Sequence, residues 1–369
     1  MTRQQAEQRF RPVGDGSTHT SDDTFYREEL QLAFRNRGMP LEALRYPLTP
    51  TGMHYLLTHF DIPDVKEAKW SLYMGGMVSK PITLTLSDIK SRPTRTVAVT
   101  MECAGNGRAL LNPRSISQPW LLEAVGTSEW TGTPLKGILD EAGIGDKAVE
   151  ILFTGLDQGV QSDIVHYYQR SLTIDEATRD EVLLAYGMNG GDLQPQHGYP
   201  LRLIVPDWYG MTSIKWLDRI EAIGEPFQGP QMDFYRYTQG DDDPGEYANL
   251  IKVRALMIPP GIPDFLTRIR LVQAGPVTLN GRAWAGRLGI SLVEVSPDNG
   301  ATWSEANLED PLSSYAWRGW SLLWEARPGT YTLCVRATDT EGNTQPISQP
   351  WNSEGLGNNM VQRVEVVVE

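Results

Sequence analysis

The feature that most constrains the fold is a change in hydrophobic pattern about two thirds of the way along the chain. Before residue 248, short apolar runs of strand type alternate with segments of helix spacing, such as 135–142. After it, strand-like runs follow one another with turns between them and without helix signals. The first pattern is typical of a mixed α+β domain, and the second of a β-sandwich. The chain is therefore predicted to form two domains of different architecture.

Strand signals are clearest in the last third. Residues 331–337 alternate strictly between apolar and other side chains. Asn299-Gly300 is a hairpin signal between strand-like runs at 290–295 and 301–303. Strands spaced by turns in this way predict one immunoglobulin-like β-sandwich over residues 249–369.

The other segments follow from composition. Residues 1–25 are polar and are predicted to be an N-terminal arm, and 26–248 are predicted to be the α+β domain, with a short helix at 26–37. The acidic segment 240–245, Gly-Asp-Asp-Asp-Pro-Gly, is predicted to join the domains. Residues 97–101 form an apolar run that predicts a buried strand.

Charge and cysteine content exclude several classes of protein. The net charge of −13 argues against a nucleic-acid partner, whose phosphates require a basic surface. No window approaches the ~18 consecutive apolar residues of a membrane span. The two cysteines form no Cys-x-x-Cys pair, so we expect neither a structural zinc site nor an attached haem. We expect a cytoplasmic protein, because no export signal is recognised; a periplasmic location would require such a signal to have been removed.

One of the cysteines lies in an unusual setting. Cys103 ends an apolar run and is followed by Ala-Gly-Asn-Gly-Arg, so its thiol should face a cleft rather than the core. Arg108 should favour its thiolate, the form that binds metals or attacks electrophiles. Cys334 lies opposite the apolar face of its strand, so we assign it a structural role.

A second cluster carries positive charge in an otherwise acidic chain. His197, Arg202 and Lys215 fall at the ends of apolar runs, between glycines, within twenty residues. Three donors converging on one cleft predict a pocket for a phosphate or another compact anion.

Three other interpretations stay open on the residues alone. The first is a dinucleotide-binding loop at Gly105-x-Gly107, but Leu110 stands where the third glycine of that fingerprint is required. A thiol hydrolase would need His54, His59, His166 or His197 as base, and no spacing selects one. A cofactor-free binding protein that works through its β-sandwich is the third. Metal analysis of the purified protein and alkylation of Cys103 discriminate between these classes.

A set of motifs resembles the sulfite oxidase family of molybdenum enzymes. Cys103-Ala-Gly-Asn-x-Arg108 resembles that family's cysteine loop, and the resemblance continues in order over roughly residues 50–368. The further matching segments are 153–157, 181–190 (a helix-to-turn segment in the resemblance), 197–202, 215–217, 281–286, 295–303 and 350–352.

The resemblance implies a role for each residue. Cys103 would be the metal ligand of a molybdenum–molybdopterin cofactor, since a soft thiolate suits molybdenum beside dithiolene sulfurs. Arg108 and Tyr235 would face the substrate, with Tyr237 the alternative tyrosine. The residues that would hold the pterin are His59, Cys103, Asp157, His197, Arg202 and Lys215. The β-sandwich would be a dimerisation domain, which implies a homodimer.

The implied activity is oxidation of sulfite to sulfate, with electrons passed to an external acceptor, either a cytochrome c-like carrier or oxygen, because no haem domain is attached. Two positions depart from the family pattern. Leu57 and Glu354 stand where substrate-binding arginines are expected. The alternative activity is therefore a molybdenum-dependent reductase or dehydrogenase acting on another oxyanion or on an S- or N-oxide.

Overall fold

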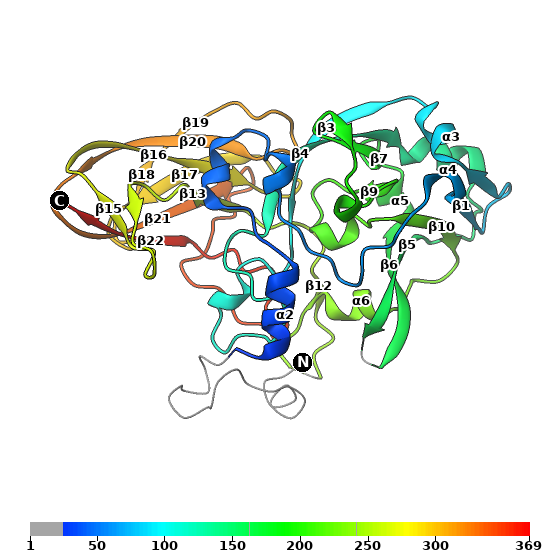
Figure 1. The fold of residues 1–369 in the computed structure, drawn as a ribbon, viewed down its shortest axis with the longest axis horizontal. Helices are drawn as coiled ribbons and strands as arrows, with labels where there is room; N and C mark the ends of the chain where they lie inside the picture. The colour runs from blue at the N-terminus through cyan, green and yellow to red at the C-terminus, as the bar shows by residue number, and fades with distance from the viewer. Residues whose placement is uncertain (1–24, 162, 241) are drawn as a thin grey trace.

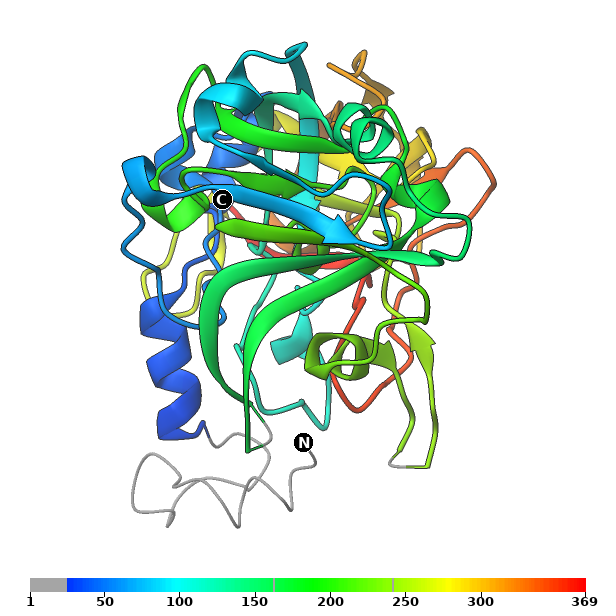
Figure 2. The same cartoon turned by 90° about the vertical axis from the view of Figure 1, so that its right-hand side faces the viewer.

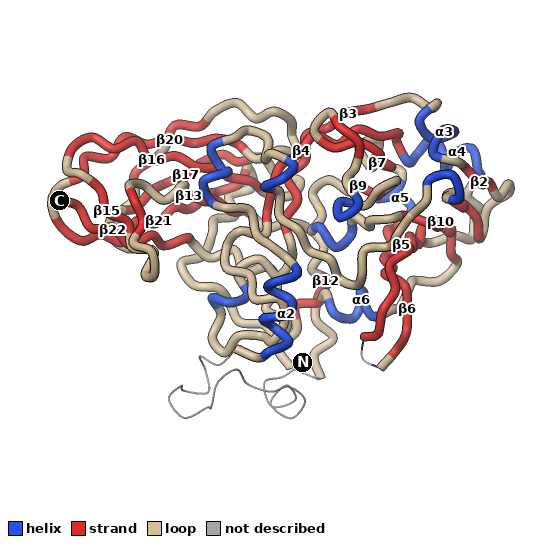
Figure 3. Tube along the Cα trace, in the orientation of Figure 1, coloured by secondary structure: helices blue, strands red, loops and turns tan. Residues whose placement is uncertain are grey.

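The computed structural model describes residues 25–161, 163–240 and 242–369, and it has two lobes joined side by side (Figure 1). Strands dominate both lobes, and the helices are short (Figure 3). The predicted arm, residues 1–25, lies outside the described residues apart from Phe25. The predicted change from a mixed to an all-strand architecture is confirmed: all five α-helices of the described chain precede residue 235.

Two large sheets and a two-stranded sheet form the first domain. The small sheet pairs β11 (Arg236–Tyr237) with β12 (Glu246–Tyr247), so the segment 240–245, predicted to join the domains, instead lies between two paired strands of the first domain. In the first sheet β1 and β10 are parallel and the other neighbours are antiparallel. Its strands, in spatial order, are β2 (Ile82–Leu84), β1 (Leu72–Gly76), β10 (Leu217–Ile223), β5 (Glu150–Gln161) and β6 (Ile164–Thr173). Figure 2 shows β5 and β6 as a long hairpin that curves away from the sheet towards the end of the molecule where helix α2 (Arg27–Arg35) lies.

The second sheet carries the cysteine motif. Its neighbours are all antiparallel, and β3 is an edge strand. The strands are β3 (Arg95–Glu102), β4 (Val125–Pro134), β7 (Leu183–Met188) and β8 (Gly191–Asp192), with β9 (Arg202–Ile204) also paired to β7. The predicted buried strand at 97–101 is β3, whose last six residues are buried.

The resemblance placed a helix-to-turn segment at 181–190, and this prediction is wrong. Residues Leu183–Met188 form strand β7, which pairs with β4 on one side and β9 on the other. Five of its six residues are buried, so it is a central strand. An apolar run of this length fits a strand covered on both faces as well as it fits a buried helix, and periodicity cannot separate the two.

The predicted helix at 135–142 is present as α4 (Leu135–Ala142), with Leu135, Ile138, Leu139 and Ala142 fully buried. The helix predicted at 26–37 is α2. The remaining α-helices are α3 (Leu86–Lys90), α5 (Ile174–Ala177) and α6 (Pro230–Phe234). Within the described ranges, none of the helices has the length and apolar character needed to cross a bilayer.

The second domain is the predicted β-sandwich. One sheet contains β13 (Arg254–Met257), β16 (Gly275–Trp284), β20 (Arg318–Ala326) and β19 (Asn307–Leu308). The other contains β14 (Ile262–Pro263), β15 (Arg270–Val272), β22 (Gln362–Val368), β21 (Gly329–Asp339), β17 (Ile290–Ser296) and β18 (Ser304–Glu305). The alternating run 331–337 lies in β21, with Leu333, Val335 and Ala337 fully buried in the core between the sheets.

The hairpin after β17 is longer than predicted. Its return strand β18 begins at Ser304 rather than at residue 301. The Asp298 carboxylate accepts hydrogen bonds from the Thr302 backbone N–H and hydroxyl, which hold the intervening residues in a loop. Asn299 and Gly300 have φ angles of 56° and 89°, as the Asn-Gly signal predicts.

The two domains share a core. Trp284 and Trp317 come from the second domain but pack in the cluster that fills the first. The Trp317 indole N–H also donates to the Pro47 carbonyl at 2.7 Å. The domains therefore meet through buried contacts, and the end of β3 lies at this junction.

Candidate active site

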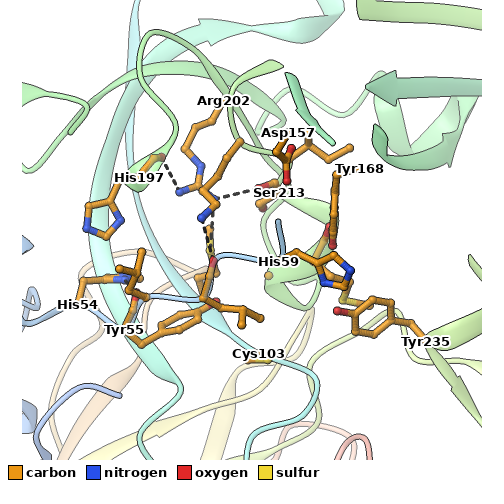
Figure 4. A pocket seen from close by; sticks show the side chains of 17 residues that line it. His54, Tyr55, His59, Cys103, Asp157, Tyr168, His197, Arg202, Ser213 and Tyr235 are labelled. Atoms are coloured by element: carbon orange, nitrogen blue, oxygen red, sulfur yellow. Dashed lines mark hydrogen bonds between the residues drawn. The ribbon is translucent and has the colours of Figure 1, made fainter. Parts of the chain in front are cut away.

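A pocket in the first domain contains seven of the eight residues predicted to form the site (Figure 4). Together with the open solvent at its mouth, it holds about 690 Å³ of space free of protein atoms. The predicted residues that line it are His59, Cys103, Asp157, His197, Arg202, Lys215 and Tyr235. The pocket therefore brings together residues that lie up to 176 positions apart in the sequence.

Cys103 lies one residue beyond the end of β3. Met101 and Cys103 both line the pocket, because side chains two residues apart in a strand point to the same side. The backbone N–H of Cys103 donates to the Ala124 carbonyl at 2.9 Å, which extends the β3–β4 pairing by one residue. The chain then turns through Gly107, whose φ of 89° favours glycine.

Arg108 favours the thiolate form of Cys103, as expected, but burial outweighs its effect in the free thiol. Burial raises the pKa of Cys103, and the nearby Arg108 charge opposes this without reversing it. Only 7% of Cys103 is exposed, so the cost of placing an unpaired negative charge there outweighs the attraction. A bound metal cation would remove that cost, because coordination deprotonates a thiol.

Two buried cations form the opposite wall. The guanidinium of Arg202 donates to the carbonyls of His197 (3.0 Å) and Ser213 (2.9 Å), and Lys215 Nζ donates to the Leu57 carbonyl (2.8 Å). In the part of the chain that the structure describes, neither cation forms a salt bridge with a carboxylate. Burial lowers the pKa of Arg202 to about 10 and that of Lys215, with help from Arg202, to about 7. An anion bound here would relieve this penalty.

Two histidines stand beside these cations as neutral rings. Burial lowers the pKa of His54 to about 4, and burial together with the proximity of His54 and Arg202 lowers that of His197 to about 3. His54 Nδ1 donates to the Tyr55 carbonyl at 3.0 Å, which leaves its Nε2 as an acceptor. The Nε2 atoms of both rings are buried and have no partner among the described residues.

His59 and Asp157 complete the polar lining. His59 Nε2 contacts the Gln161 amide oxygen at 2.9 Å, and burial lowers the pKa of this histidine. Burial raises the pKa of Asp157 to about 6, against the opposing charge of Lys215. Asp157 is therefore the carboxylate whose charge acts on the pKa of the buried Lys215.

Tyr235 is the tyrosine of its segment that reaches the pocket. It follows helix α6, and the guanidinium of the fully buried Arg170 lies 5.6 Å from its ring centre. Burial, and then the proximity of Cys103, raise the pKa of Tyr235 to about 12, so its phenol is a hydrogen-bond donor at neutral pH. Tyr237 lines a different pocket, together with Lys252 and residues of the second domain.

Arg108 does not line the pocket. Its Nε donates to the Glu354 carbonyl at 2.9 Å, and Gly355, with a φ of 61°, makes room for its side chain. It still lies close enough to influence the pKa values of Cys103 and Tyr235. Leu57 does line the pocket, where the resemblance led us to expect an arginine.

Sequence reasoning missed several polar residues of the lining. His54 was considered only as one of four bases for a hydrolase, while Tyr55, Tyr168 and Ser213 were not considered. Tyr168 lies on β6 and donates its hydroxyl proton to the Met211 carbonyl at 3.0 Å. The Tyr-Tyr pair at 167–168 alternates between an exposed and a buried ring, but the sequence carries no sign that the buried one meets Cys103.

The pocket fits the predicted cofactor chemically. Arg202 and Lys215 offer positive charge for a phosphate, and Arg202 Nε is also buried without a partner among the described residues. The open ring nitrogens of His54 and His197 suit the polar edge of a pterin. Cys103, on the facing wall, supplies one soft ligand of the kind that molybdenum prefers.

Comparison with known proteins agrees with this chemistry. Residues 59–231 match the family model of the oxidoreductase molybdopterin binding domain, and residues 251–369 match that of the Mo-co oxidoreductase dimerisation domain. The mitochondrial sulfite oxidase of Rattus norvegicus is 30% identical over 98% of this chain and 70% of its own length. The NADH nitrate reductase of Spinacia oleracea is 31% identical over 90% of this chain but only 39% of its own length.

A solved structure supports the fold. The sulfane dehydrogenase SoxCD from Paracoccus pantotrophus superposes with a TM-score of 0.78, covering 99% of this chain and 92% of that one at 23% identity. Two family models in sequence order, a relative covered over most of its length and a shared fold therefore agree. This chain belongs to the sulfite oxidase family of molybdenum-cofactor oxidoreductases.

Proposed function

We propose that this protein oxidises a small sulfur oxyanion at a molybdenum centre held by Cys103, with sulfite as the first substrate to test. The observation that carries the proposal is the placement of Cys103 and Tyr235 in the same pocket as the cationic wall of Arg202 and Lys215. A metal ligand, a proton donor and an anion-binding surface then share one cavity. The rat relative is named a sulfite oxidase.

The residues divide between cofactor and substrate. Arg202 and Lys215 would bind the phosphate, His54 and His197 the polar edge of the pterin, and Cys103 the metal. His59 and Asp157 are proposed to complete the pterin site. When bound, the cofactor supplies the two-electron redox chemistry and the oxygen that sulfite acquires.

The chain's own contribution on the substrate side comes from Tyr235 and Arg108. The Tyr235 phenol stays protonated at neutral pH and would donate a hydrogen bond to a substrate oxygen. Arg108 adds positive charge from behind Cys103 without entering the lining. Buried tyrosine rings, including Tyr168, limit the access of water to this side of the pocket.

One observation favours a second candidate. Leu57 presents an apolar side chain where a cation would help to bind a dianion, and Glu354 draws Arg108 towards its own carbonyl. A substrate with less negative charge, such as a sulfane-bearing thiol or an S-oxide, would tolerate this surface better. The structurally similar SoxCD is named a sulfane dehydrogenase, and other relatives are named nitrate reductases.

The electron acceptor and the oligomeric state are also proposed from the similarity to the family. Electrons would pass to an external acceptor, a cytochrome c-like carrier or oxygen. Residues 251–369, which match a dimerisation domain, would form a homodimer. We also propose a cytoplasmic location.

The test is a comparison of substrates on the purified, molybdenum-loaded protein. Turnover of sulfite with ferricyanide or ferricytochrome c as acceptor is measured beside oxidation of a persulfide and reduction of a sulfoxide and of nitrate. Sulfite should give the highest kcat/KM. A loaded enzyme that turns over another of these substrates but not sulfite would replace the first candidate with the second.

A further inference from the structure

The strand that carries Cys103 is held along its open edge by the second domain. Strand β3 lies at the edge of its sheet, and an unpaired edge is where backbone groups need other partners. The Thr100 backbone N–H donates to the Tyr315 carbonyl at 2.8 Å, and the Trp317 backbone N–H donates to the Thr100 hydroxyl at 2.7 Å. The Ser313 hydroxyl donates to the Ala98 carbonyl at 2.6 Å.

The strongest contact of this kind involves Glu102, the residue before the metal ligand. Because side chains alternate along β3, Glu102 points away from the pocket that Met101 and Cys103 line. Its carboxylate is 2% exposed and accepts hydrogen bonds from Arg254 (2.7 Å) and from the Trp284 indole (2.9 Å), both in the β-sandwich.

The loop after Cys103 is also bonded to the second domain through its backbone. The Ala104 carbonyl accepts from the Gly357 N–H at 2.7 Å, and the Gly107 carbonyl accepts from the Asn358 side chain at 2.7 Å. Arg254 joins the two sets, because its NH1 also donates to the Asn358 carbonyl at 2.9 Å.

Within the loop itself, Asn106 connects these contacts. Its side-chain nitrogen donates to Glu102 at 2.9 Å, and its oxygen accepts from the Ala124 backbone N–H at 3.1 Å. A shift of Glu102 would therefore be transmitted to the turn that follows Cys103.

We propose that the β-sandwich is a positioning element of the metal site as well as a dimerisation domain, and that Glu102 is the residue through which it sets the Cys103 loop. The proposal rests on the proposed role of Cys103 as metal ligand. Outer partners of a metal ligand fix its orientation, and their loss typically weakens metal binding or activity 10- to 100-fold. A buried carboxylate that loses one donor keeps the desolvation cost, so the loop should rearrange rather than stay in place.

The test uses amide hydrogen exchange at residues 103–108 in the purified full-length holoenzyme. Trp284→Phe retains an aromatic ring but removes the indole donor to Glu102, and Arg254→Met removes the cation. Trp320→Phe is the matched control: its indole is as deeply buried in the β-sandwich, and the N–H has no partner in the described chain. Arg254→Lys tests rescue of the charge.

Exchange at 103–108 should be about tenfold faster or more in Trp284→Phe and in Arg254→Met, intermediate in Arg254→Lys, and unchanged in Trp320→Phe. The electron paramagnetic resonance signal of the bound molybdenum should change in Trp284→Phe and not in the control. Unchanged exchange at 103–108 in Trp284→Phe, or a uniform rise across both domains in all variants, would overturn the proposal.

This readout separates two failures. If the wild-type protein binds no molybdenum, the proposed function fails, yet the exchange comparison still decides whether the second domain orders the Cys103 loop. If molybdenum binds and hydrogen exchange at 103–108 is unchanged in Trp284→Phe, only the positioning role fails.

Discussion

The two walls of the pocket differ in what they leave unsatisfied. The wall of His197, Arg202 and Lys215 has buried positive charge and open nitrogen atoms, held by backbone carbonyls and by no carboxylate salt bridge in the described chain. The wall of Cys103 and Tyr235 is formed by a thiol, a phenol and apolar side chains. An anion would stabilise the wall of His197, Arg202 and Lys215. The wall of Cys103 and Tyr235 does not require a ligand of one particular charge.

This difference separates the proposed cofactor site from the proposed substrate site. The proposed cofactor carries a phosphate, which the cationic wall would bind, and the residues of this wall lie in segments that resemble the family. The proposed substrate would meet the other wall, where Leu57 stands at a position for which the resemblance led us to expect an arginine. The predictions below perturb one wall at a time.

The largest effect is expected from the metal ligand. Cys103→Ser should lower molybdenum-dependent turnover at least about a hundredfold, because a serine oxygen is a harder and more basic ligand. The fold should persist, since the side chains are similar in volume. Steady-state kinetics and molybdenum content measure the effect, and Cys334→Ser, in the β-sandwich, is the control. Full activity of Cys103→Ser would remove the metal-ligand assignment.

The cationic wall should respond in opposite directions with and without cofactor. Lys215→Met should weaken cofactor retention about 10- to 100-fold, because a charge-assisted hydrogen bond to phosphate is lost. The same substitution should raise the thermal stability of the cofactor-free protein, since it removes a buried lysine whose pKa burial has already lowered to about 7.

Thermal unfolding of both forms measures these shifts. Lys136→Met, at an exposed i,i+4 pair on α4, is the control and should change neither. A variant that loses stability in both forms would show that Lys215 is structural rather than a ligand for an anion.

The sequence predicted the cationic wall more completely than the wall of Cys103 and Tyr235, because the residues of the cationic wall lie close together in the sequence. His197, Arg202 and Lys215 lie within twenty residues, so a local cluster revealed them. Tyr168 and His54 come from distant segments and meet only in three dimensions. The contacts of Arg108 with Glu354 and of Glu102 with Trp284 join residues 246 and 182 positions apart, and no local pattern contains them.

The fold shows the same limit. Strict apolar alternation identified β21, although Cys334 on its other face is also buried, and helix spacing identified α4, whose buried residues lie on one face. Strand β7 is buried on both faces, so its apolar run carries no period that distinguishes a strand from a helix. The helix-to-turn assignment at 181–190 came from the resemblance, and the period of this buried run offers nothing that would have corrected it.

On the substrate wall, Tyr235→Phe should lower kcat/KM about tenfold, because it removes one hydrogen-bond donor to the reacting oxyanion. Tyr237→Phe is the matched control, since Tyr237 lines another pocket. It should change kcat/KM by less than about twofold. Steady-state kinetics with the small acceptor ferricyanide isolates this step from docking of a protein acceptor. Equal effects of the two substitutions would contradict the assignment of Tyr235.

Restoring a cation to this wall should sharpen the comparison. Leu57→Arg places positive charge in the pocket lining and should lower the KM for sulfite about tenfold, with a smaller effect on kcat. Leu57→Met changes the shape without the charge and is the control. If Leu57→Arg instead abolishes turnover of the natural substrate while leaving cofactor content intact, a less charged substrate is favoured.

The smallest effect concerns pH and the neutral histidines. Because burial holds the pKa of His197 near 3, below its ordinary 6.5, the unfolded state binds more protons between these values. His197 therefore makes stability rise with pH across about 3 to 6.5 and fall as the solution is acidified. Asp157, whose pKa is raised to about 6, acts in the opposite direction between about 4 and 6.

Urea unfolding of the cofactor-free protein at pH 4.5 and pH 7 tests this linkage. His197→Gln should reduce the loss of unfolding free energy between these pH values by roughly 1–2 kcal/mol, since the protonation difference disappears. The slope of the wild-type protein between the same two pH values is the reference. If His197→Gln retained that slope, His197 would have to be charged in the fold, and the cationic wall would carry one more positive group for an anion than the structure assigns to it.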